Sequence, residues 1–137
     1  MLLQGKRIFI VEDNPLNRAT YQMVTVLHGA QLEFERWGRD TLRRLKQVGQ
    51  VDLVILDLML PGGVSGYDVF QEIHNAPEFA AIPIIAVSAA EPSTALVKTR
   101  QLGFSGFIAK PIDDDLFPKQ LAQILAGKQV WDAGNHL

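Results

Sequence analysis

Short apolar runs alternate with longer amphipathic segments along the chain. The runs are four to six residues long, which is the length of a buried β-strand. They occupy residues 8–11, 32–37, 51–56, 82–87 and 106–109. Because most of these runs lack the alternation of a strand with one solvated face, they predict a parallel sheet covered on both sides.

The segments between the runs repeat apolar residues at the spacing of an amphipathic helix. In the first segment, Asn14 supplies a helix N-cap, Pro15 suits the first helical position, and Gly29 suits the end. The apolar residues at helical spacing there are Leu16, Ala19, Met23, Val26 and Leu27. Further helices are expected over residues 40–47, 67–74, 93–102 and 114–125.

Five strand–helix repeats joined by right-handed crossovers predict a doubly wound α/β sandwich. The chain has 137 residues, which is an ordinary size for one domain. We expect this domain to span residues 1–127 and residues 128–137 to form a short C-terminal tail.

Composition and charge exclude several classes of protein. Thirteen basic and fifteen acidic residues give a net charge of −2, whereas general nucleic-acid binders and polybasic membrane-surface proteins usually carry excess positive charge. The absence of cysteine excludes disulfides, thiolate nucleophiles and cysteine-ligated zinc. The longest apolar stretch, residues 79–87, has nine residues, and a membrane-spanning helix needs about 20. We therefore expect a cytoplasmic protein that binds no membrane and no nucleic acid directly.

Polar residues stand where the apolar runs end. Glu12 and Asp13 follow the first run, Asp57 the third, Ser88 the fourth and Lys110 the fifth. Taken singly, the first two suit helix caps, the serine a turn and the lysine a solvated loop. Because the carboxyl ends of parallel strands share one edge of a sheet, all five are expected to converge on one site.

The chemistry of this set indicates phosphoryl transfer. Three neighbouring carboxylates repel one another, and one or two would protonate unless a cation were bound. Oxygen ligands without cysteine or histidine suit Mg²⁺. A carboxylate attacks phosphorus to form an aspartyl phosphate, and Mg²⁺ with Lys110 would neutralise the phosphoryl oxygens while Ser88 hydrogen-bonds one of them. The set predicts Mg²⁺-dependent phosphorylation of Asp57.

Four motifs contain these residues. They are Val11-Glu12-Asp13-Asn14, Leu53-Val54-Ile55-Leu56-Asp57 with Pro61 and Gly66, Val87-Ser88-Ala89, and Lys110-Pro111. With these motifs the chain resembles a response regulator receiver domain of bacterial two-component signalling over nearly its whole length. The resemblance implies a flavodoxin-like fold whose five-stranded parallel sheet has the order 2-1-3-4-5.

The resemblance also implies a phosphoacceptor and a metal site. Asp57 would accept the phosphoryl group. Asp13, Asp57 and the backbone carbonyl of Met59 would ligate Mg²⁺ directly, while Glu12 would act mostly through water.

A second group of residues would respond to phosphorylation. Ser88 matches the family's switch hydroxyl, and Lys110 would pair with a phosphoryl oxygen. Phe107 matches the switch aromatic residue, although a plain core phenylalanine on the last strand is an equal interpretation. Pro111 resembles the family's cis-peptide proline, which would fix the direction of the lysine.

The loop after the phosphoacceptor departs from the family pattern. Receiver domains usually have the loop glycine one residue closer, whereas Gly66 stands nine positions after Asp57. The loop over residues 61–66 is thus one residue longer, and access for a phosphatase or a partner would differ. Met59 precedes the insertion, so its carbonyl is expected to keep its place.

The resulting prediction is a stand-alone signalling switch rather than an enzyme, although the chain would catalyse its own phosphorylation and dephosphorylation. A sensor histidine kinase or a histidine phosphotransfer protein would donate the phosphoryl group. The changed surface would bind a downstream protein or form a homodimer. A receiver cut from a hybrid kinase would show the same features.

Two other functions remain open. A Mg²⁺-dependent phosphohydrolase would also use an aspartyl phosphate, but it usually has a second acid where this chain has Met59. A phosphorylation-independent interaction module would share the fold, and it usually lacks an acid or the lysine. Separately, Arg39, Arg43, Arg44 and Lys46 form either a solvated face or a surface for an acidic partner.

Overall fold

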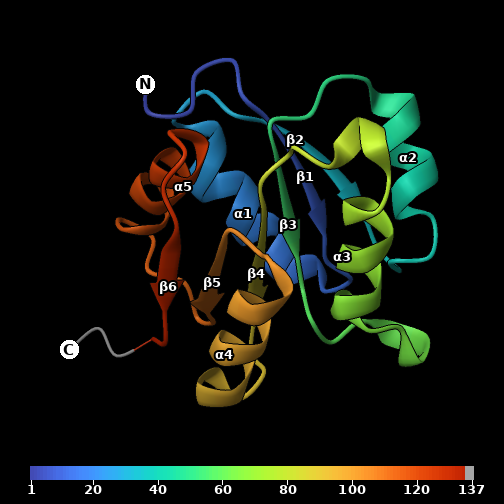
Figure 1. The fold of residues 1–137 in the computed structure, drawn as a ribbon. Coiled ribbons are helices and arrows are strands. Elements are labelled where there is room, and N and C mark those ends of the chain that lie inside the picture. The colour runs from blue at the N-terminus through green and yellow to red at the C-terminus, as the bar shows by residue number, and fades with distance from the viewer. Residues whose placement is uncertain (135–137) are drawn as a thin grey trace.

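The computed structural model describes residues 1–134 as a parallel sheet between two layers of helices (Figure 1). Six strands lie in the order β2-β1-β3-β4-β5-β6. The strands are β1 (Arg7–Val11), β2 (Gln31–Glu35), β3 (Leu53–Leu56), β4 (Ile84–Ser88), β5 (Gly106–Ala109) and β6 (Val130–Asp132). The first five strands have the predicted order, which confirms the flavodoxin-like doubly wound fold.

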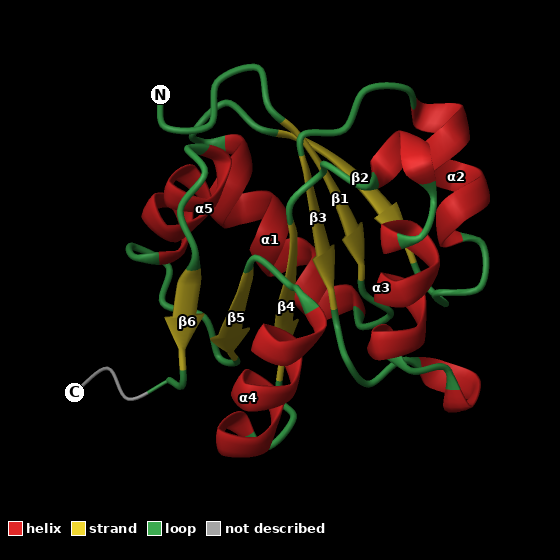
Figure 2. Cartoon of the chain, viewed as in Figure 1, coloured by secondary structure: helices red, strands yellow, loops and turns green. Residues whose placement is uncertain are grey.

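The helices divide between the two faces of the sheet, as Figure 2 shows. One face is covered by α1 (Pro15–Val26) and α5 (Phe117–Leu125). The other is covered by α2 (Thr41–Val48), α3 (Gly66–His74) and α4 (Pro92–Leu102). Two short 3₁₀ helices, η1 (Pro61–Gly63) and η2 (Pro77–Phe79), lie before and after α3. Every residue of β3, β4 and β5 is buried, as expected for strands packed on both faces.

The sixth strand corrects the prediction of a five-stranded sheet followed by a tail. β6 pairs in parallel with β5, and Trp131 lies opposite Phe107. Only three residues form this strand, so it has no apolar run long enough to stand out in the sequence. Residues 135–137 of the predicted tail lie outside the described residues.

Several predicted boundaries were also wrong. β3 begins at Leu53 rather than at residue 51, and β4 begins at Ile84 rather than at residue 82. The second strand ends at Glu35 rather than at residue 37, because the backbone N–H groups of Trp37 and Gly38 bond the Glu35 carboxylate instead of continuing the ladder. The last helix begins at Phe117 rather than at residue 114. Before it, the Asp113 carboxylate accepts the N–H groups of residues 115 and 116 in a separate turn.

Helix α1 exposes most of the apolar residues that predicted it. Leu16 is 78% exposed and Leu27 is 77% exposed, whereas Tyr21 and Val24 are buried against the sheet. The spacing was therefore a correct signal for a helix, but it marked the outward side.

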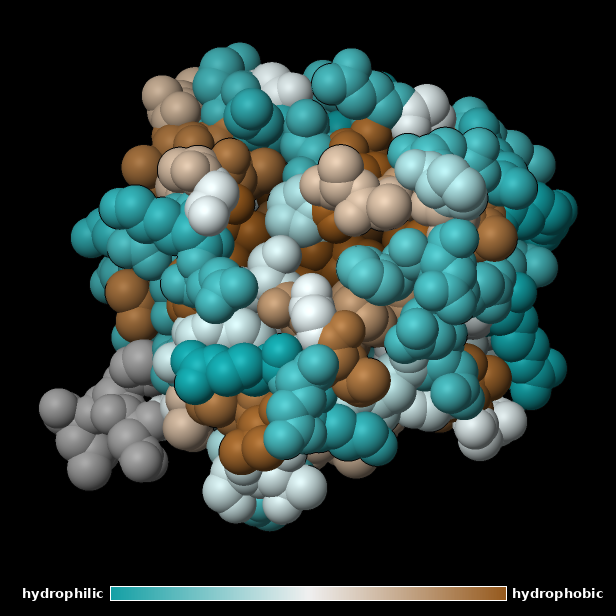
Figure 3. All heavy atoms as spheres, in the orientation of Figure 1, coloured by the Kyte–Doolittle hydropathy of each residue, from teal (hydrophilic) through white to brown (hydrophobic). Residues whose placement is uncertain are grey.

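On the face shown in Figure 3, hydrophilic side chains divide the apolar atoms into small areas. Within residues 1–134, no helix is both long and apolar enough to cross a membrane.

Candidate functional site

The carboxyl ends of β1, β3, β4 and β5 bring the predicted site residues together. Carboxylate oxygens of Glu12, Asp13 and Asp57 all lie within 4.8 Å of one another. Glu12 and Asp57 are buried, whereas Asp13 is exposed at the mouth of the cluster. This arrangement can hold a divalent cation, since hard oxygen donors from two strand ends face one point.

Lys110 supplies the positive charge next to these acids. Its Nζ lies 2.6 Å from Oε1 of Glu12 and 3.0 Å from Oδ2 of Asp57. Burial by itself lowers the pKa of Lys110, but the hydrogen bond to Glu12 and the charges of both acids outweigh it and raise the pKa above its ordinary value. The lysine is thus held as a cation between two buried carboxylates.

The Asp57 carboxylate has hydrogen-bond donors on both oxygens. Oδ1 accepts the Ser88 hydroxyl at 2.9 Å and the backbone N–H of Met59 at 3.1 Å, while Oδ2 accepts Lys110. The Ser88 oxygen in turn accepts the backbone N–H of Ala90 at 3.2 Å. These contacts fix the orientation of a buried acid and point a hydroxyl and an ammonium group at it.

Local hydrogen bonds hold the turn between β1 and α1. Asn14 caps α1 by accepting the N–H groups of Leu16 at 2.8 Å and of residue 17 at 3.1 Å. The Arg18 guanidinium donates to the carbonyls of Glu12 at 3.3 Å and of Asp13 at 3.1 Å. No feature of the sequence places Arg18 at the site. Its contacts there arise from the shape of the turn between β1 and α1, and no sequence motif marks them.

The β3–α3 loop explains why a glycine stands at position 66. A Cβ atom there would lie 2.2 Å from the carbonyl oxygen of Asp57 and 2.7 Å from the Cα of Leu58. At the tip of this loop, Gly62 and Gly63 have φ values of 70° and 73°, which favour glycine. Below the tip, Leu60 N–H donates to the carbonyl of residue 64 at 3.2 Å, so the base of the loop stays narrow beside the site.

The remaining predicted residues lie on β5 or just after it. The peptide bond between Lys110 and Pro111 is cis. Phe107 is fully buried in the core layer under α4. It lies on an interior strand rather than on the last one, because β6 pairs beyond it.

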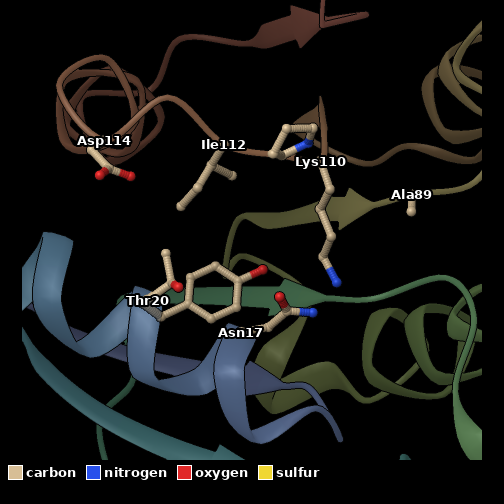
Figure 4. A pocket seen from close by; sticks show the side chains of 8 residues that line it. Asn17, Thr20, Ala89, Lys110, Ile112 and Asp114 are labelled. Atoms are coloured by element: carbon tan, nitrogen blue, oxygen red, sulfur yellow. The ribbon is translucent and has the colours of Figure 1, made fainter.

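A pocket of about 420 Å³ opens beside the lysine, between α1 and the loop after β5 (Figure 4). Asn17 and Thr20 of α1 lie across it from Ile112, and the Lys110 side chain extends along its edge. Tyr21 also lines the pocket. Burial, followed by the charges of Glu12 and Asp57, raises the pKa of this phenol well above its ordinary value. The sequence offered no sign of this tyrosine, since it lies outside the apolar row of its helix.

Comparisons with known proteins agree with this geometry. The family model of the response regulator receiver domain matches residues 8–122. Protein PilH of Pseudomonas aeruginosa is 28% identical over 121 residues, which make up 88% of this chain and 98% of PilH. The polar-differentiation response regulator DivK of Brucella ovis is 32% identical over 120 residues, or 88% of this chain and 96% of DivK.

A solved structure leads to the same family. The signal receiver domain of a signal transduction histidine kinase from Syntrophus aciditrophicus has a TM-score of 0.78 and 28% identity, covering 90% of this chain and 92% of that one. The family match includes all five of the strand-end residues that meet at the site. The chain belongs to the response regulator receiver domain family, and it is a receiver of two-component signalling.

Proposed function

We propose that Asp57 accepts a phosphoryl group in the cytoplasm from the phosphohistidine of a sensor histidine kinase or a phosphotransfer protein. The observation that carries this proposal is the environment of one carboxylate. Asp57 is buried, yet it accepts hydrogen bonds from Ser88, from the Met59 N–H and from Lys110, all within 3.1 Å.

The donor set fits Mg²⁺. Three carboxylates lie close together and only one ammonium group contacts them, at Glu12 and Asp57, so the cluster keeps an excess of negative charge that a divalent cation would balance. Glu12, Asp13 and Asp57 would hold the ion together with the backbone carbonyl of Met59. When bound, the ion would neutralise charge on the transferring phosphoryl oxygens.

In the transfer step, an oxygen of the Asp57 carboxylate attacks phosphorus and an acyl phosphate bond forms. The phosphorus–nitrogen bond of the donor breaks, and its electron pair stays on the imidazole nitrogen, which takes up a proton. Lys110 then pairs with a phosphoryl oxygen. The Ser88 hydroxyl exchanges its bond to the carboxylate for a bond to a phosphoryl oxygen.

These new contacts would change the protein surface through the elements that carry them. Ser88 ends β4 and precedes α4, while Lys110 follows β5 and precedes α5. A shift of either side chain therefore biases the position of a helix. We infer that the surface around α4, β5 and α5 changes its affinity for a downstream protein or for a second copy of the chain.

The test is intact-mass measurement after incubation with acetyl phosphate and Mg²⁺. The wild-type chain should gain one phosphoryl group, and Asp57→Asn or an excess of chelator should abolish the gain. Asp68→Asn, at an acid on α3 outside the site, is the matched control and should label like wild type. Absence of labelling, or labelling at another residue, would overturn the proposal. Steady release of phosphate from many small phosphoesters would instead favour a phosphohydrolase.

A further inference from the structure

The sixth strand places a tryptophan beside a residue of the predicted switch. The parallel register pairs Trp131 with Phe107, so the two side chains lie on the same face of the sheet. Phe107 is fully buried, and Trp131 packs against the same core layer. On the opposite face, Val130 enters the second core layer under α5. β6 is thus anchored in both layers of the core.

Contacts with two helices hold Trp131 and its strand. The Arg100 guanidinium of α4 lies 4.7 Å from the centre of the Trp131 ring. Gln120 of α5 donates from Nε2 to a carboxylate oxygen of Asp132 at 2.8 Å. α4 and α5 lie on opposite faces of the sheet, so these two contacts hold β6 from both faces (Figure 1).

The neighbouring strand is shaped to receive β6. A Cβ atom at Gly106 would lie only 2.5 Å from the carbonyl oxygen of Val130. Any larger residue at this position would push the two strands apart. The close approach of the two strands therefore depends on the glycine in β5 as well as on the residues of β6.

The strand that β6 holds is the one that carries the lysine to the site. β5 pairs with β4 through Ala109 and Ser88, and the Lys110 N–H donates to the Ser88 carbonyl at 3.0 Å. Without β6, the four residues of β5 would be an edge strand with an open flank beside Phe107. Edge elements with few buried contacts open more readily than interior ones. Such opening would move the Lys110 ammonium away from Asp57.

We propose that Trp131 is a positioning residue for phosphoryl transfer to Asp57. It closes the flank of β5 beside Phe107 and so holds Lys110 within reach of the phosphoacceptor. The role rests on the proposed function, because it concerns the same transfer. It adds a requirement outside the site, on the strand beyond the five that the family resemblance predicted.

The first test measures the rate of Asp57 phosphorylation by acetyl phosphate over a range of donor concentrations. Trp131→Ala should lower the maximal rate about tenfold, because small displacements of a positioned group are costly to transfer rates. Trp131→Phe keeps an aromatic ring at this place and should recover most of the rate. Trp37→Ala removes the other tryptophan, at the opposite edge of the sheet, and should react like wild type.

The second test separates positioning from mere stability. Hydrogen exchange is measured on the full chain with and without beryllium fluoride and Mg²⁺, a stable mimic of the phosphoryl group. Amides of β5 and β6 should exchange at least threefold more slowly with the mimic bound, because coupling between the site and the strand acts in both directions. Because the bound mimic also stabilises the whole fold, the amides of β2 at the opposite edge serve as the reference. A strand that only stabilises the fold would slow no more than β2 does.

The outcomes are distinguishable. If the wild-type chain gains no phosphoryl group, the proposed function fails, and the positioning role fails with it. If the wild type is phosphorylated and a folded Trp131→Ala variant keeps the wild-type rate, only the positioning role fails. If Trp131→Ala does not fold, Arg100→Ala replaces it, since that side chain is exposed and contacts the ring from outside. An unchanged rate in that variant, with unchanged exchange in wild type, overturns the proposal.

Discussion

The strand-end site and the β6 edge are held together by opposite kinds of interaction. At the site, charged groups meet at hydrogen-bond distance, and Lys110 contacts two buried acids. At the edge, Trp131 packs against apolar atoms and under one guanidinium. The site depends on paired charges on backbone that is buried in the core, whereas the edge depends on a strand of three residues with a neighbour on one side only. Changes at the site should therefore cost more than similar changes at the edge.

Two glycines allow a direct comparison of the regions. Gly66→Ala would force a Cβ against the backbone of Asp57 and Leu58, which belongs to the core and has no room to move. Gly106→Ala would force a Cβ against the Val130 carbonyl, which moves if β6 detaches. We expect a loss in the free energy of unfolding of about 4 kcal/mol for Gly66→Ala and about 2 kcal/mol for Gly106→Ala. Urea denaturation measures both.

The control for this comparison is Gly63→Ala at the tip of the same loop as Gly66. No atom lies within 4 Å of a Cβ there, so only the left-handed backbone is strained, at a cost of about 1 kcal/mol. Equal losses for the substitutions at positions 66 and 106 would contradict the difference between the regions.

The next largest effect concerns charge at the site. Lys110→Met leaves Glu12 and Asp57 buried without a counter-charge, while their hydrogen bonds to backbone N–H groups remain. We expect a destabilisation of about 2 kcal/mol, below the usual cost of breaking a fully buried ion pair. Mg²⁺ should recover part of this loss, because it binds only the folded cluster. The urea midpoint with and without Mg²⁺ is the measurement.

Lys119→Met is the matched control, since this lysine is exposed on α5. Its midpoint should stay near that of wild type in both conditions. A Lys110→Met variant as stable as this control, with no response to Mg²⁺, would show that the lysine does not compensate the acids.

The smallest effect concerns Glu91, the exposed N-cap of α4, the helix that carries Arg100. Its carboxylate accepts the Ser93 hydroxyl and the N–H groups of Thr94 and Ser93, and these bonds lower its pKa from 4.5 to about 2. Because the folded-state pKa is the lower one, the stabilisation is complete above pH 4.5 and fades as the pH falls towards 2. Glu91→Ala should therefore lower the urea midpoint slightly at pH 7 and less at pH 3.

Glu72→Ala, at an exposed glutamate on α3, provides the reference for this pH series. The loss for Glu91→Ala, measured relative to Glu72→Ala, should be larger at pH 7 than at pH 3. If the two variants show the same pH dependence, the carboxylate at the start of α4 does not act as a cap.

Much of the fold and the polar site could be predicted because both follow from the apolar runs. Continuous runs mark buried parallel strands, and the residues that end them must share one edge of the sheet. The sequence alone was thus enough to group five polar residues at one site, and the structure brings them together. They are Glu12, Asp13, Asp57, Ser88 and Lys110.

The features that were missed have no periodic signal. β6 is too short to show a run, and its partner on β5 is marked only by the small size of Gly106. Tyr21 lines the pocket from the buried side of α1, whereas the apolar residues that predicted this helix lie on its exposed side. Such features depend on which tertiary neighbour lies next to an element, and one sequence does not contain that information in a local pattern.

The direction of β6 also decides where the described chain leaves the fold. α5 returns the chain to the amino ends of the strands, and β6, parallel to β5, then carries it back towards the rim that bears Lys110. A Cβ at Gly134 would lie 3.1 Å from the Cβ of Ala109, the residue just before that lysine. A fluorescent protein or affinity tag fused after residue 134 would therefore emerge at the rim of the sheet that carries the proposed phosphoacceptor and hinder large donors, whereas the same fusion at the N-terminus would leave that rim clear (Figure 1).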